Sequence, residues 1–319
     1  MSDKLRVGVI GVGYLGRFHA QKYRHMPDVE LVGVVDTDAN QARKVADENE
    51  TTPYGNYQAL FDRVDAISIA APTPAHFSIA KTFLERNVDV LIEKPITTRL
   101  EDADELIRIA ESGGQIIQVG HLERFNPAVV ALKGKIDRPR FIESHRLSIF
   151  QGRCTDVSVV LDLMIHDIDL ILSLVGSEIK TVNAAGITVI SGNIDIANAR
   201  LAFVNGAVAN VTASRISAKN ERKLRLFQKN AYISIDFANH SITLVQPDED
   251  RNDFIIPGMS METLNFDKSD ALDDELKSFV ASVRHRRQPL VTGKMGRDAL
   301  KAALSIMEQI QATNSCLES

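Results

Sequence analysis

The chain has 319 residues, of which 44% are hydrophobic and 25% charged, and this composition is typical of a globular protein rather than a disordered or fibrous one. At about 150 residues per domain, the length predicts two domains that each have their own core. The 37 Lys and Arg residues against 42 Asp and Glu give a net charge of -5 without a basic block, so we expect no nucleic-acid partner.

Strand and helix patterns alternate over the first 120 residues. Continuous apolar strands separated by helices are typical of a parallel sheet covered on both faces. With right-handed crossovers, a doubly wound α/β sheet (a Rossmann domain, residues 1–120) is the simplest topology. The expected strands are Leu5–Ile10, Leu31–Val35, Ala66–Ile69, Val88–Ile92 and Ile116–Val119, and the expected helices are Tyr14–Arg24, Ala39–Glu48, Pro74–Glu85 and Glu101–Glu111.

The first strand leads into a glycine-rich turn, which should bind the pyrophosphate of a dinucleotide through Gly11, Gly13, Tyr14, Leu15 and Gly16. In this pattern the first glycine permits a tight turn, the second lets the backbone approach the phosphates, and the third allows close helix packing. The N–H groups at the start of the helix complete the anion site. Asp36 ends the second strand, where a carboxylate accepts hydrogen bonds from the adenosine ribose and repels a 2′-phosphate. The sequence therefore predicts NAD in preference to NADP.

Two further segments follow strands of this sheet. Thr73 and His76 come after Ala66–Ile69, and Glu93 and Lys94 come at the end of the next strand. Because ligands of doubly wound sheets bind outside the carboxyl ends of the strands, we expect all four residues near the nicotinamide half of the cofactor. The pair Thr73-Pro74 is also typical of an ordinary N-cap and first helical residue, and Lys94-Pro95 of an exposed turn. Both alternatives stay open.

After Gly120 the pattern becomes that of an α+β domain, which we place at residues 121–319. Short turns such as Asn205-Gly206 between consecutive strands favour a large, mainly antiparallel sheet. A loop-helix segment (His121–Gly134) and a strand (Arg140–Phe150) come first, and two helices (Ala271–Arg287 and Lys294–Ala312) close the chain. The strands between them are expected at Thr181–Ile190, Ala197–Val204, Ala207–Ser214, Arg222–Phe227, Ala231–Phe237 and Ser241–Val245.

An apolar helix is expected at Val157–Val175. Its acidic residues and His166 exclude a membrane span, and an α-helix would place Asp162, His166 and Asp169 on one face. Polar groups on a buried helix need partners, a metal or a wet cleft. No HExxH or paired-cysteine pattern indicates zinc, and a histidine is suited to accept a hydroxyl proton. We therefore predict acid–base chemistry without a metal, and a structural network is the alternative.

Together, Gly11–Gly16, Glu93-Lys94-Pro95 and Asp162-Leu-Met-Ile-His166 resemble the Gfo/Idh/MocA oxidoreductase family, in the same order along essentially the whole chain. The resemblance implies hydride transfer between a sugar hydroxyl and NAD. Lys94 and His166 would share proton transfer, and Asp162 would position the hydroxyl or the histidine. It also implies an open sheet with a subunit interface, hence a homodimer or homotetramer, and a C-terminal helix packed back on the first domain.

Within that family, the runs Gly120–Pro127 and Asp162–Val175 look most like those of bacterial UDP-N-acetylglucosamine 3-dehydrogenases, which act before a transamination that yields diamino sugars for lipid A or other glycans. This likeness implies that Arg124 and Asn126 lie near the substrate and its diphosphate. Further candidate phosphate contacts are Lys133, Lys135 and Arg153. Asn126-Pro127 is also typical of a helix N-cap. The alternatives are a dehydrogenase of a free sugar or cyclitol such as myo-inositol, and a non-catalytic NAD-sensing regulator.

The cysteine count and the N-terminus bear on the compartment. Cys154 and Cys316 are too few for a disulfide framework or a four-cysteine zinc site, which favours a reducing environment. The apolar run at the N-terminus has no small-residue cleavage site after it, so we expect a cytoplasmic protein.

Overall fold

The structure is a computed structural model that describes residues 4–150, 152, 157–248, 257–267 and 269–317. It divides into two compact units. The first unit comprises Met1–Leu122 and Asp270–Leu300, and the second comprises Glu123–Ser269 and Lys301–Ser319.

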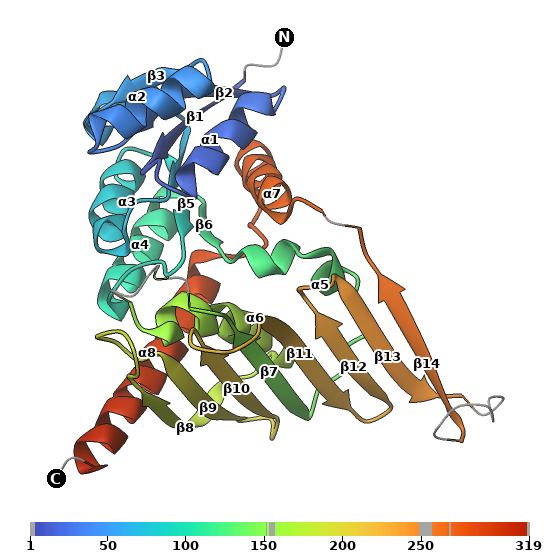
Figure 1. Ribbon diagram of the computed structural model, residues 1–319. Helices are drawn as coiled ribbons and strands as arrows, with labels where there is room; N and C mark the ends of the chain where they lie inside the picture. Colours follow the sequence, from blue (N-terminus) through green and yellow to red (C-terminus); the bar gives the residue numbers. More distant parts are fainter. Residues whose placement is uncertain (1–3, 151, 153–156, 249–256, 268, 318–319) are drawn as a thin grey trace. The chain divides into compact units, whose positions relative to one another are not determined.

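The first unit is built on a parallel six-stranded sheet in the order β3-β2-β1-β4-β5-β6 (Figure 1). This order confirms the predicted doubly wound sheet. The strands are β1 (Leu5–Ile10), β2 (Val29–Val35), β3 (Thr52–Tyr54), β4 (Ala66–Ile69), β5 (Asp89–Glu93) and β6 (Ile117–Gly120). The sequence pattern did not indicate β3, which has only three residues, none of them fully buried.

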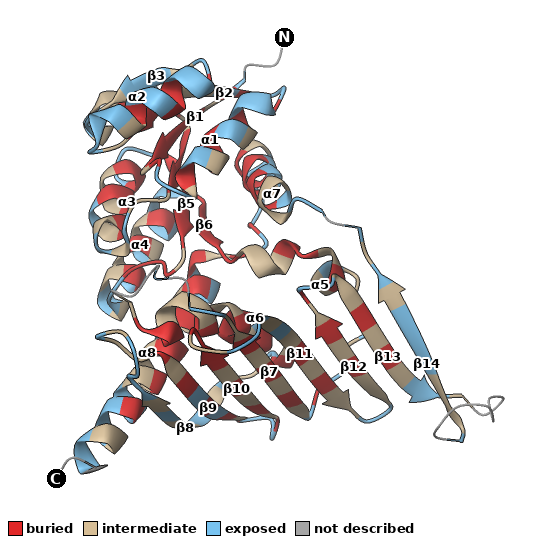
Figure 2. Ribbon diagram, in the orientation of Figure 1, coloured by how far each residue is buried: buried red, intermediate tan, exposed pale blue. Residues whose placement is uncertain are grey.

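Helices cover both faces of this sheet. On one side α1 (Gly16–His25) packs beside α2 (Ala39–Glu48) and α7 (Ala271–His285), and on the other α3 (His76–Leu84) packs beside α4 (Leu100–Gly113). Every residue of β4 and β5 is buried, as the red central strands in Figure 2 show. Strands covered on both faces read as continuous apolar runs, which is why the sequence located them well.

The second unit contains an eight-stranded sheet in the order β14-β13-β12-β11-β7-β10-β9-β8. Neighbouring strands are antiparallel except β7 and β10, which are parallel. The predicted, mainly antiparallel sheet is therefore confirmed, with β14 as an additional edge strand. The strands are β7 (Phe141–Leu147), β8 (Ile179–Ile187), β9 (Ile196–Phe203), β10 (Val208–Ser214), β11 (Glu221–Gln228), β12 (Ala231–Asp236), β13 (Ser241–Pro247) and β14 (Met259–Asn265).

One face of this sheet forms the core of the second unit. A row of buried apolar side chains crosses six strands in register, and the alternation of buried and half-buried positions is visible along each strand in Figure 2. Helix α6 (Ile165–Val175) packs against β7 and β10. The row consists of Leu201, Ala209, Ile142, Leu226, Ile233 and Leu244.

The helical elements of the second unit depart from the predicted pattern in one place. The expected continuous α-helix over Val157–Val175 is wrong, because Val160–Met164 forms a π-helical turn and the α-helix begins only at Ile165. The short helix α5 (Pro127–Val130) precedes β7, and α8 (Gly293–Leu317) ends the described chain. None of the described helices has both the length and the apolar character that crossing a membrane requires.

Candidate active site

The glycine-rich turn between β1 and α1 is shaped by its three glycines. Gly11 has a φ of +82°, and a Cβ added there would lie 2.4 Å from the Ala71 nitrogen. A Cβ on Gly16 would lie 1.8 Å from the Gly11 oxygen, whereas one on Gly13 would meet nothing within 4 Å. The first and third glycines therefore permit the turn and the close packing of α1, and the second borders open space. Helix α1 starts without a side-chain cap, so its first N–H groups suit an anion.

Asp36 and Gln41 hold this turn against β2 and α2. The Asp36 carboxylate accepts hydrogen bonds from the backbone nitrogens of Val12 (2.9 Å) and Asp38 (3.0 Å). Gln41 Nε2 donates to the Val12 oxygen at 2.6 Å. Asp38 is the N-cap of α2. Asp36 thus directly follows β2 and lies beside the turn, as its position in the sequence indicated. Gln41 was missed, because an amide on a helix surface gives no recognisable signal.

The segment after β4 begins differently from the predicted helix start. Thr73–Ala75 forms a 3-10 turn whose N-cap is Pro72, and Thr73 makes no capping hydrogen bond. The N-cap interpretation of Thr73 is therefore wrong. An extended proline precedes the turn, and α3 begins only at His76.

His76 joins two loops of the first unit. Its side chain is buried, with Nδ1 3.0 Å from the Pro95 oxygen and Nε2 2.7 Å from the Ala71 oxygen. Burial lowers the pKa of His76, which keeps the ring neutral at neutral pH, so it donates to one of the two carbonyl oxygens and only contacts the other. This geometry favours the structural interpretation of His76, since it ties the turn after β4 to the turn after β5.

Lys94 follows directly from the buried end of β5. The peptide bond between Lys94 and Pro95 is cis, and the Lys94 residue is half-buried. Its backbone N–H donates to Oε2 of the buried Glu93 at 3.3 Å. A lysine at the carboxyl end of a central parallel strand lies at the edge where such sheets bind their ligands.

Asp162 and His166 lie at the junction of the π-helical turn and α6. Asp162 falls within Val160–Met164 and His166 within the first turn of α6, and both are half-buried. π-helical turns are rare and frequently occur at functional sites. The third polar residue of the predicted stripe, Asp169, is instead fully buried.

Asp169 binds Arg124 through a two-point ion pair. Arg124 Nε lies 2.6 Å from Asp169 Oδ2, and Nη2 lies 3.1 Å from Oδ1. A guanidinium fork and a carboxylate have matched geometry, so such a pair fixes the orientation of the arginine. The sequence did not reveal this contact, because the two residues are brought together only by the packing of α6.

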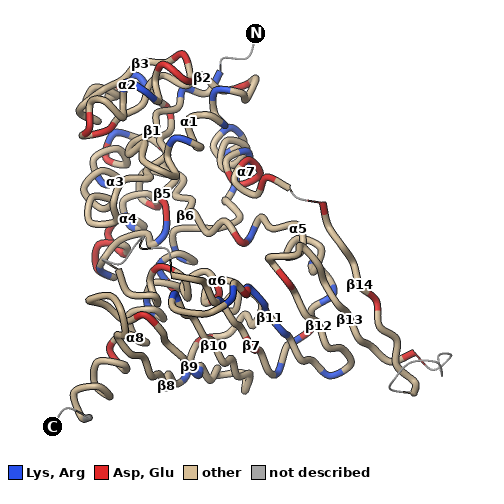
Figure 3. Tube along the Cα trace, viewed as in Figure 1, with Lys and Arg blue, Asp and Glu red and all other residues tan. Residues whose placement is uncertain are grey.

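A second arginine, Arg146 on β7, is fully buried among carboxylates. It binds both oxygens of Asp167 at 2.8 and 3.0 Å and Glu123 Oε1 at 2.9 Å. Burial acts to lower the pKa of Arg146, but the charges of Asp167 and Glu123 outweigh it and raise the pKa above its usual value. Acidic and basic positions accordingly lie together around α6 in Figure 3. Removing one member of such a buried group typically costs about 3–5 kcal/mol.

The other predicted substrate contacts have varied surroundings. Asn126 caps α5, with Oδ1 3.0 Å from the Ala128 nitrogen, and its Nδ2 lies 3.4 Å from Glu123. Lys133 and Lys135 are exposed. Arg153 and Cys154 lie outside the described residues.

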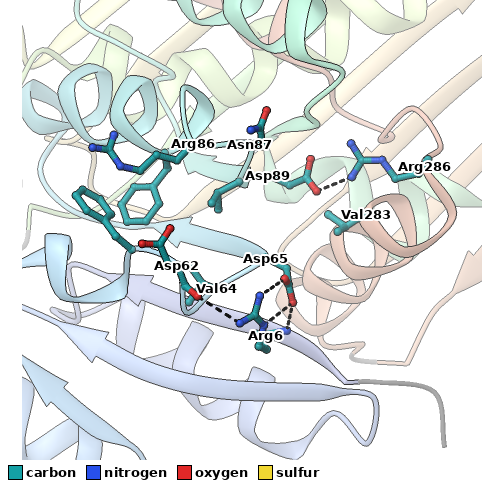
Figure 4. A pocket seen from close by; sticks show the side chains of 12 residues that line it. Arg6, Asp62, Val64, Asp65, Arg86, Asn87, Asp89, Val283 and Arg286 are labelled. Atoms are coloured by element: carbon teal, nitrogen blue, oxygen red, sulfur yellow. Dashed lines mark hydrogen bonds and ion pairs between the residues drawn. The ribbon is translucent and has the colours of Figure 1, made fainter.

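A polar pocket of about 380 Å³ lies at the opposite end of the first sheet (Figure 4). It is lined by residues before and at the start of β4 and β5, together with Arg6 and Arg286. Two of its three arginines pair with lining carboxylates, Arg6 with Asp65 at 2.6 Å and Arg286 with Asp89 at 2.6 Å. Doubly wound sheets bind ligands at the carboxyl ends of their strands, so this pocket is not the candidate site.

Comparison with known proteins identifies the family. The NAD-binding Rossmann-fold model of the Gfo/Idh/MocA oxidoreductase family matches residues 5–121, and the Gfo/Idh/MocA C-terminal domain model matches residues 128–234. The UDP-N-acetylglucosamine 3-dehydrogenase of Acidithiobacillus ferrooxidans is 38% identical over 309 residues, covering 97% of this chain and 98% of that enzyme. The chain belongs to the Gfo/Idh/MocA oxidoreductase family. It is a dehydrogenase that acts on CH–OH groups, as the sequence motifs predicted.

Solved structures of family members share the whole fold. The A. ferrooxidans enzyme has a TM-score of 0.91 at 37% identity, covering 97% of this chain and 98% of that chain. The myo-inositol 2-dehydrogenase of Lactobacillus plantarum has a TM-score of 0.81 at 26% identity, covering 98% of each chain.

A further relative was found by sequence comparison. The scyllo-inositol 2-dehydrogenase (NAD(+)) of Bacillus subtilis is 28% identical over 338 residues, covering 99% of this chain and 95% of that enzyme.

Proposed function

We propose that this Gfo/Idh/MocA dehydrogenase oxidises the 3-hydroxyl of UDP-N-acetylglucosamine, or of a similar nucleotide sugar, with NAD. The observation that carries the proposal is the 38% identity to the A. ferrooxidans UDP-N-acetylglucosamine 3-dehydrogenase over 97% of this chain. The inositol dehydrogenase of B. subtilis covers as much of the chain at 28% identity. Fold alone does not fix a substrate, so the difference in identity, and not the shared architecture, favours the nucleotide sugar.

The first unit fits a dinucleotide. Gly13 borders open space and α1 begins without a side-chain cap, which suits the pyrophosphate. Asp36 follows β2 beside this turn, which favours a ribose 2′-hydroxyl over a 2′-phosphate and hence NAD over NADP. When bound, NAD accepts hydride at its nicotinamide ring. We further propose that Thr73 and Glu93 belong to the nicotinamide half, and the absence of a capping role leaves the Thr73 hydroxyl suited to a ligand.

Three residues carry the proposed proton chemistry. Lys94 and His166 accept and return the proton of the sugar hydroxyl, and Asp162 orients the hydroxyl or the imidazole. Oxidation of an alcohol by hydride loss requires the hydroxyl proton to leave, and a positioned base typically contributes about 10²–10⁴-fold to such a step. The half-buried setting of Lys94, Asp162 and His166 supports these roles, because each residue is accessible to a ligand yet held by a buried element.

Arg124 and Asn126 are the proposed contacts to the diphosphate-bearing substrate. Asp169 binds the Nε and Nη2 edge of the Arg124 guanidinium. Arginine has five N–H donors, so the fixed side chain keeps its Nη1 donors for an anion. Asp169 is then the residue that orients Arg124, which the sequence motifs did not indicate.

The proposed substrate is tested by turnover with a panel. Purified enzyme, with its bound nicotinamide first fully oxidised, is mixed with UDP-N-acetylglucosamine, myo-inositol, glucose or glucose 6-phosphate. We expect nicotinamide fluorescence to rise with the nucleotide sugar alone. Reduction by myo-inositol or glucose alone would instead assign a free cyclitol or sugar, and no reduction by any of them would favour a non-catalytic NAD-sensing role.

A further inference from the structure

A buried chain of polar contacts in the first unit ends at the backbone of Lys94. His19, on α1, is completely buried, and its Nδ1 lies 2.8 Å from Ser68 Oγ on β4. On the other side of the ring, Nε2 lies 3.2 Å from Glu93 Oε1, within ion-pairing distance. The second oxygen of Glu93 accepts the Lys94 N–H at 3.3 Å. The two nitrogens of His19 thus connect β4 to the residue that precedes Lys94.

The hydrogen-bond donors from Tyr23 to His19 can all point the same way along this chain. Tyr23, one turn after His19 on α1, donates from its hydroxyl to Ser68 Oγ at 3.4 Å. Ser68 can then donate to His19 Nδ1, which leaves Nε2 against the Glu93 carboxylate at 3.2 Å, in a close contact that lacks the angle of a hydrogen bond. Burial raises the pKa of Tyr23 well above its ordinary value, which keeps the phenol protonated as the first donor.

A glycine on the neighbouring strand makes room for the Glu93 carboxylate. A Cβ added to Gly120, at the end of β6, would lie 2.9 Å from the Glu93 carboxyl carbon and from both of its oxygens. Such contacts are shorter than van der Waals distance, so any larger residue would displace the carboxylate. Gly120 and His19 therefore constrain the same group, Gly120 by leaving space and His19 by an attractive contact.

We propose that His19 is a positioning residue for Lys94, acting through the Glu93 carboxylate that binds the Lys94 backbone N–H. The inference deepens the proposed function and rests on it only for the catalytic role of Lys94. Neither nitrogen of His19 needs to contact the substrate or the cofactor for this role. Misplacing a catalytic group by about 1 Å can cost about 100-fold in rate, so a buried residue that fixes the Lys94 backbone has a kinetic effect.

A matched pair of substitutions separates this role from simple packing. In His19→Gln the side-chain amide nitrogen can occupy the position of Nε2 and still reach Glu93. In His19→Asn the shorter amide corresponds to Nδ1, so it can bind Ser68 but cannot reach Glu93. Both variants replace the ring by an amide. His25→Asn, at the exposed end of the same helix, is the surface control.

Two readouts are measured on the full-length protein. The first is the amide resonance and hydrogen-exchange rate of Lys94 in protein labelled with ¹⁵N-lysine, assigned through Lys94→Met and recorded without substrate. The second is the hydride-transfer rate at saturating NAD and UDP-N-acetylglucosamine, with the NAD dissociation constant measured separately. For His19→Asn we expect a shifted Lys94 amide, about tenfold faster exchange, and hydride transfer about 10- to 100-fold slower. For His19→Gln we expect all these values within about threefold of the wild type, with NAD affinity preserved in both variants.

The proposal is wrong if His19→Asn leaves the Lys94 amide unchanged, if both variants lose rate equally, or if the loss falls on NAD affinity. Should His19→Asn fail to fold, Gly120→Ala displaces the same carboxylate by a steric contact and must shift the Lys94 amide. An unchanged amide in that variant also overturns the proposal. A wild-type enzyme that fails to oxidise the nucleotide sugar would contradict the proposed function. The amide measurement needs no substrate, so it would still show whether His19 positions the Lys94 backbone.

Discussion

Lys94 is the residue on which the proposed chemistry depends most. It follows the last residue of a central strand, and its backbone is held by a buried carboxylate. We expect Lys94→Met to lower turnover by at least about 100-fold, because it removes the group that exchanges a proton with the hydroxyl. The NAD dissociation constant should stay within about threefold of the wild type, because the pyrophosphate and ribose contacts are elsewhere. Steady-state rates and NAD titration by fluorescence measure both.

Lys81→Met is the matched control for this substitution. Lys81 also belongs to the first unit, but it forms a surface ion pair with Glu105 at 2.7 Å. Surface pairs of this kind contribute little to stability, so turnover should be unchanged. A Lys94→Met enzyme that keeps wild-type turnover, or that loses NAD affinity instead, would assign Lys94 a structural role.

Asp36 sets the proposed preference for NAD. Because its carboxylate also accepts two backbone N–H groups, alanine would disturb the glycine-rich turn as well as the charge. Asp36→Asn removes the charge and keeps one of the two acceptor oxygens, so it disturbs the turn less than alanine would. We expect the ratio of NADP to NAD affinity to rise by about tenfold or more, since the repulsion of a 2′-phosphate disappears. An unchanged ratio in competitive titrations would refute the ribose assignment.

Among individual residues, the sequence identified those whose roles depend on their neighbours along the chain. The positions of Gly11, Gly13, Gly16 and Asp36 follow from backbone conformation and from the order of one strand and one helix. Partners that are distant along the chain, such as Asp169 for Arg124, depend on packing that no local pattern encodes.

Among the elements, the π-helical turn Val160–Met164 is the departure with the clearest physical origin. The spacing of the apolar residues fits both an α-helix and a π-helical turn, because nearly every side of the segment is apolar. The periodicity of the apolar residues therefore could not exclude a π-helical turn, which has about one more residue per turn than an α-helix. The consequence is that Asp162 lies in the π-helical turn, whereas His166 and Asp169 lie together in α6.

The turn that joins β8 to β9 is held by the buried carboxylate of Asp195. Its Oδ2 accepts the backbone N–H groups of Val189, Ile190 and Ser191 at 2.8, 2.7 and 2.9 Å, and its Oδ1 accepts the Ser191 hydroxyl at 2.6 Å. Burial acts to raise the pKa of Asp195, but these hydrogen bonds outweigh it and lower the pKa well below the ordinary value of 3.8.

This carboxylate makes stability depend on pH in a defined direction. Above about pH 4 it is ionised in both the folded and the unfolded chain, and its stabilisation is fully present. As the pH falls below that value, the unfolded chain takes up a proton that the folded chain resists, so stability is lost. We expect Asp195→Asn to lower the free energy of unfolding by about 2 kcal/mol at pH 7, with the difference shrinking as the pH falls from about 4 towards 2.

Urea unfolding of wild type and variant at several pH values measures this difference. Asp137→Asn, an exposed aspartate in the same unit, should change the free energy by less than about 0.5 kcal/mol. A difference between wild type and Asp195→Asn that grows as the pH falls would contradict the assignment.

For the whole molecule, the sequence predicted the two kinds of sheet but not every strand. Buried parallel strands and short antiparallel strands have distinct patterns. Short or edge strands such as β3 and β14 contribute few buried residues and were missed. The parallel pairing of β7 with β10 was also missed, because β7 is inserted between strands that are distant from it in the sequence.

The outward face of the second sheet bears on assembly. A half-buried apolar row crosses it in register, and three of its rings are in contact, with Phe141 and Phe227 centroids 5.5 Å apart and Phe227 and Tyr232 centroids 5.0 Å apart. We propose that this face joins copies of the chain into a dimer or tetramer. Sedimentation velocity should give the mass of an oligomer, and Phe227→Lys should reduce it. A monomeric wild type would contradict the proposal.

The proposed loss of hydride from C3 of a nucleotide sugar can be followed by isotope transfer. Enzyme with bound NAD is given UDP-N-acetylglucosamine carrying deuterium at C3 or, in parallel, at C4, and the released nicotinamide is analysed by mass spectrometry. We expect deuterium in the nicotinamide from the C3-labelled sugar only. Transfer from the C4 label, or reduction of NAD by deuterated myo-inositol and not by the nucleotide sugar, would contradict the proposal.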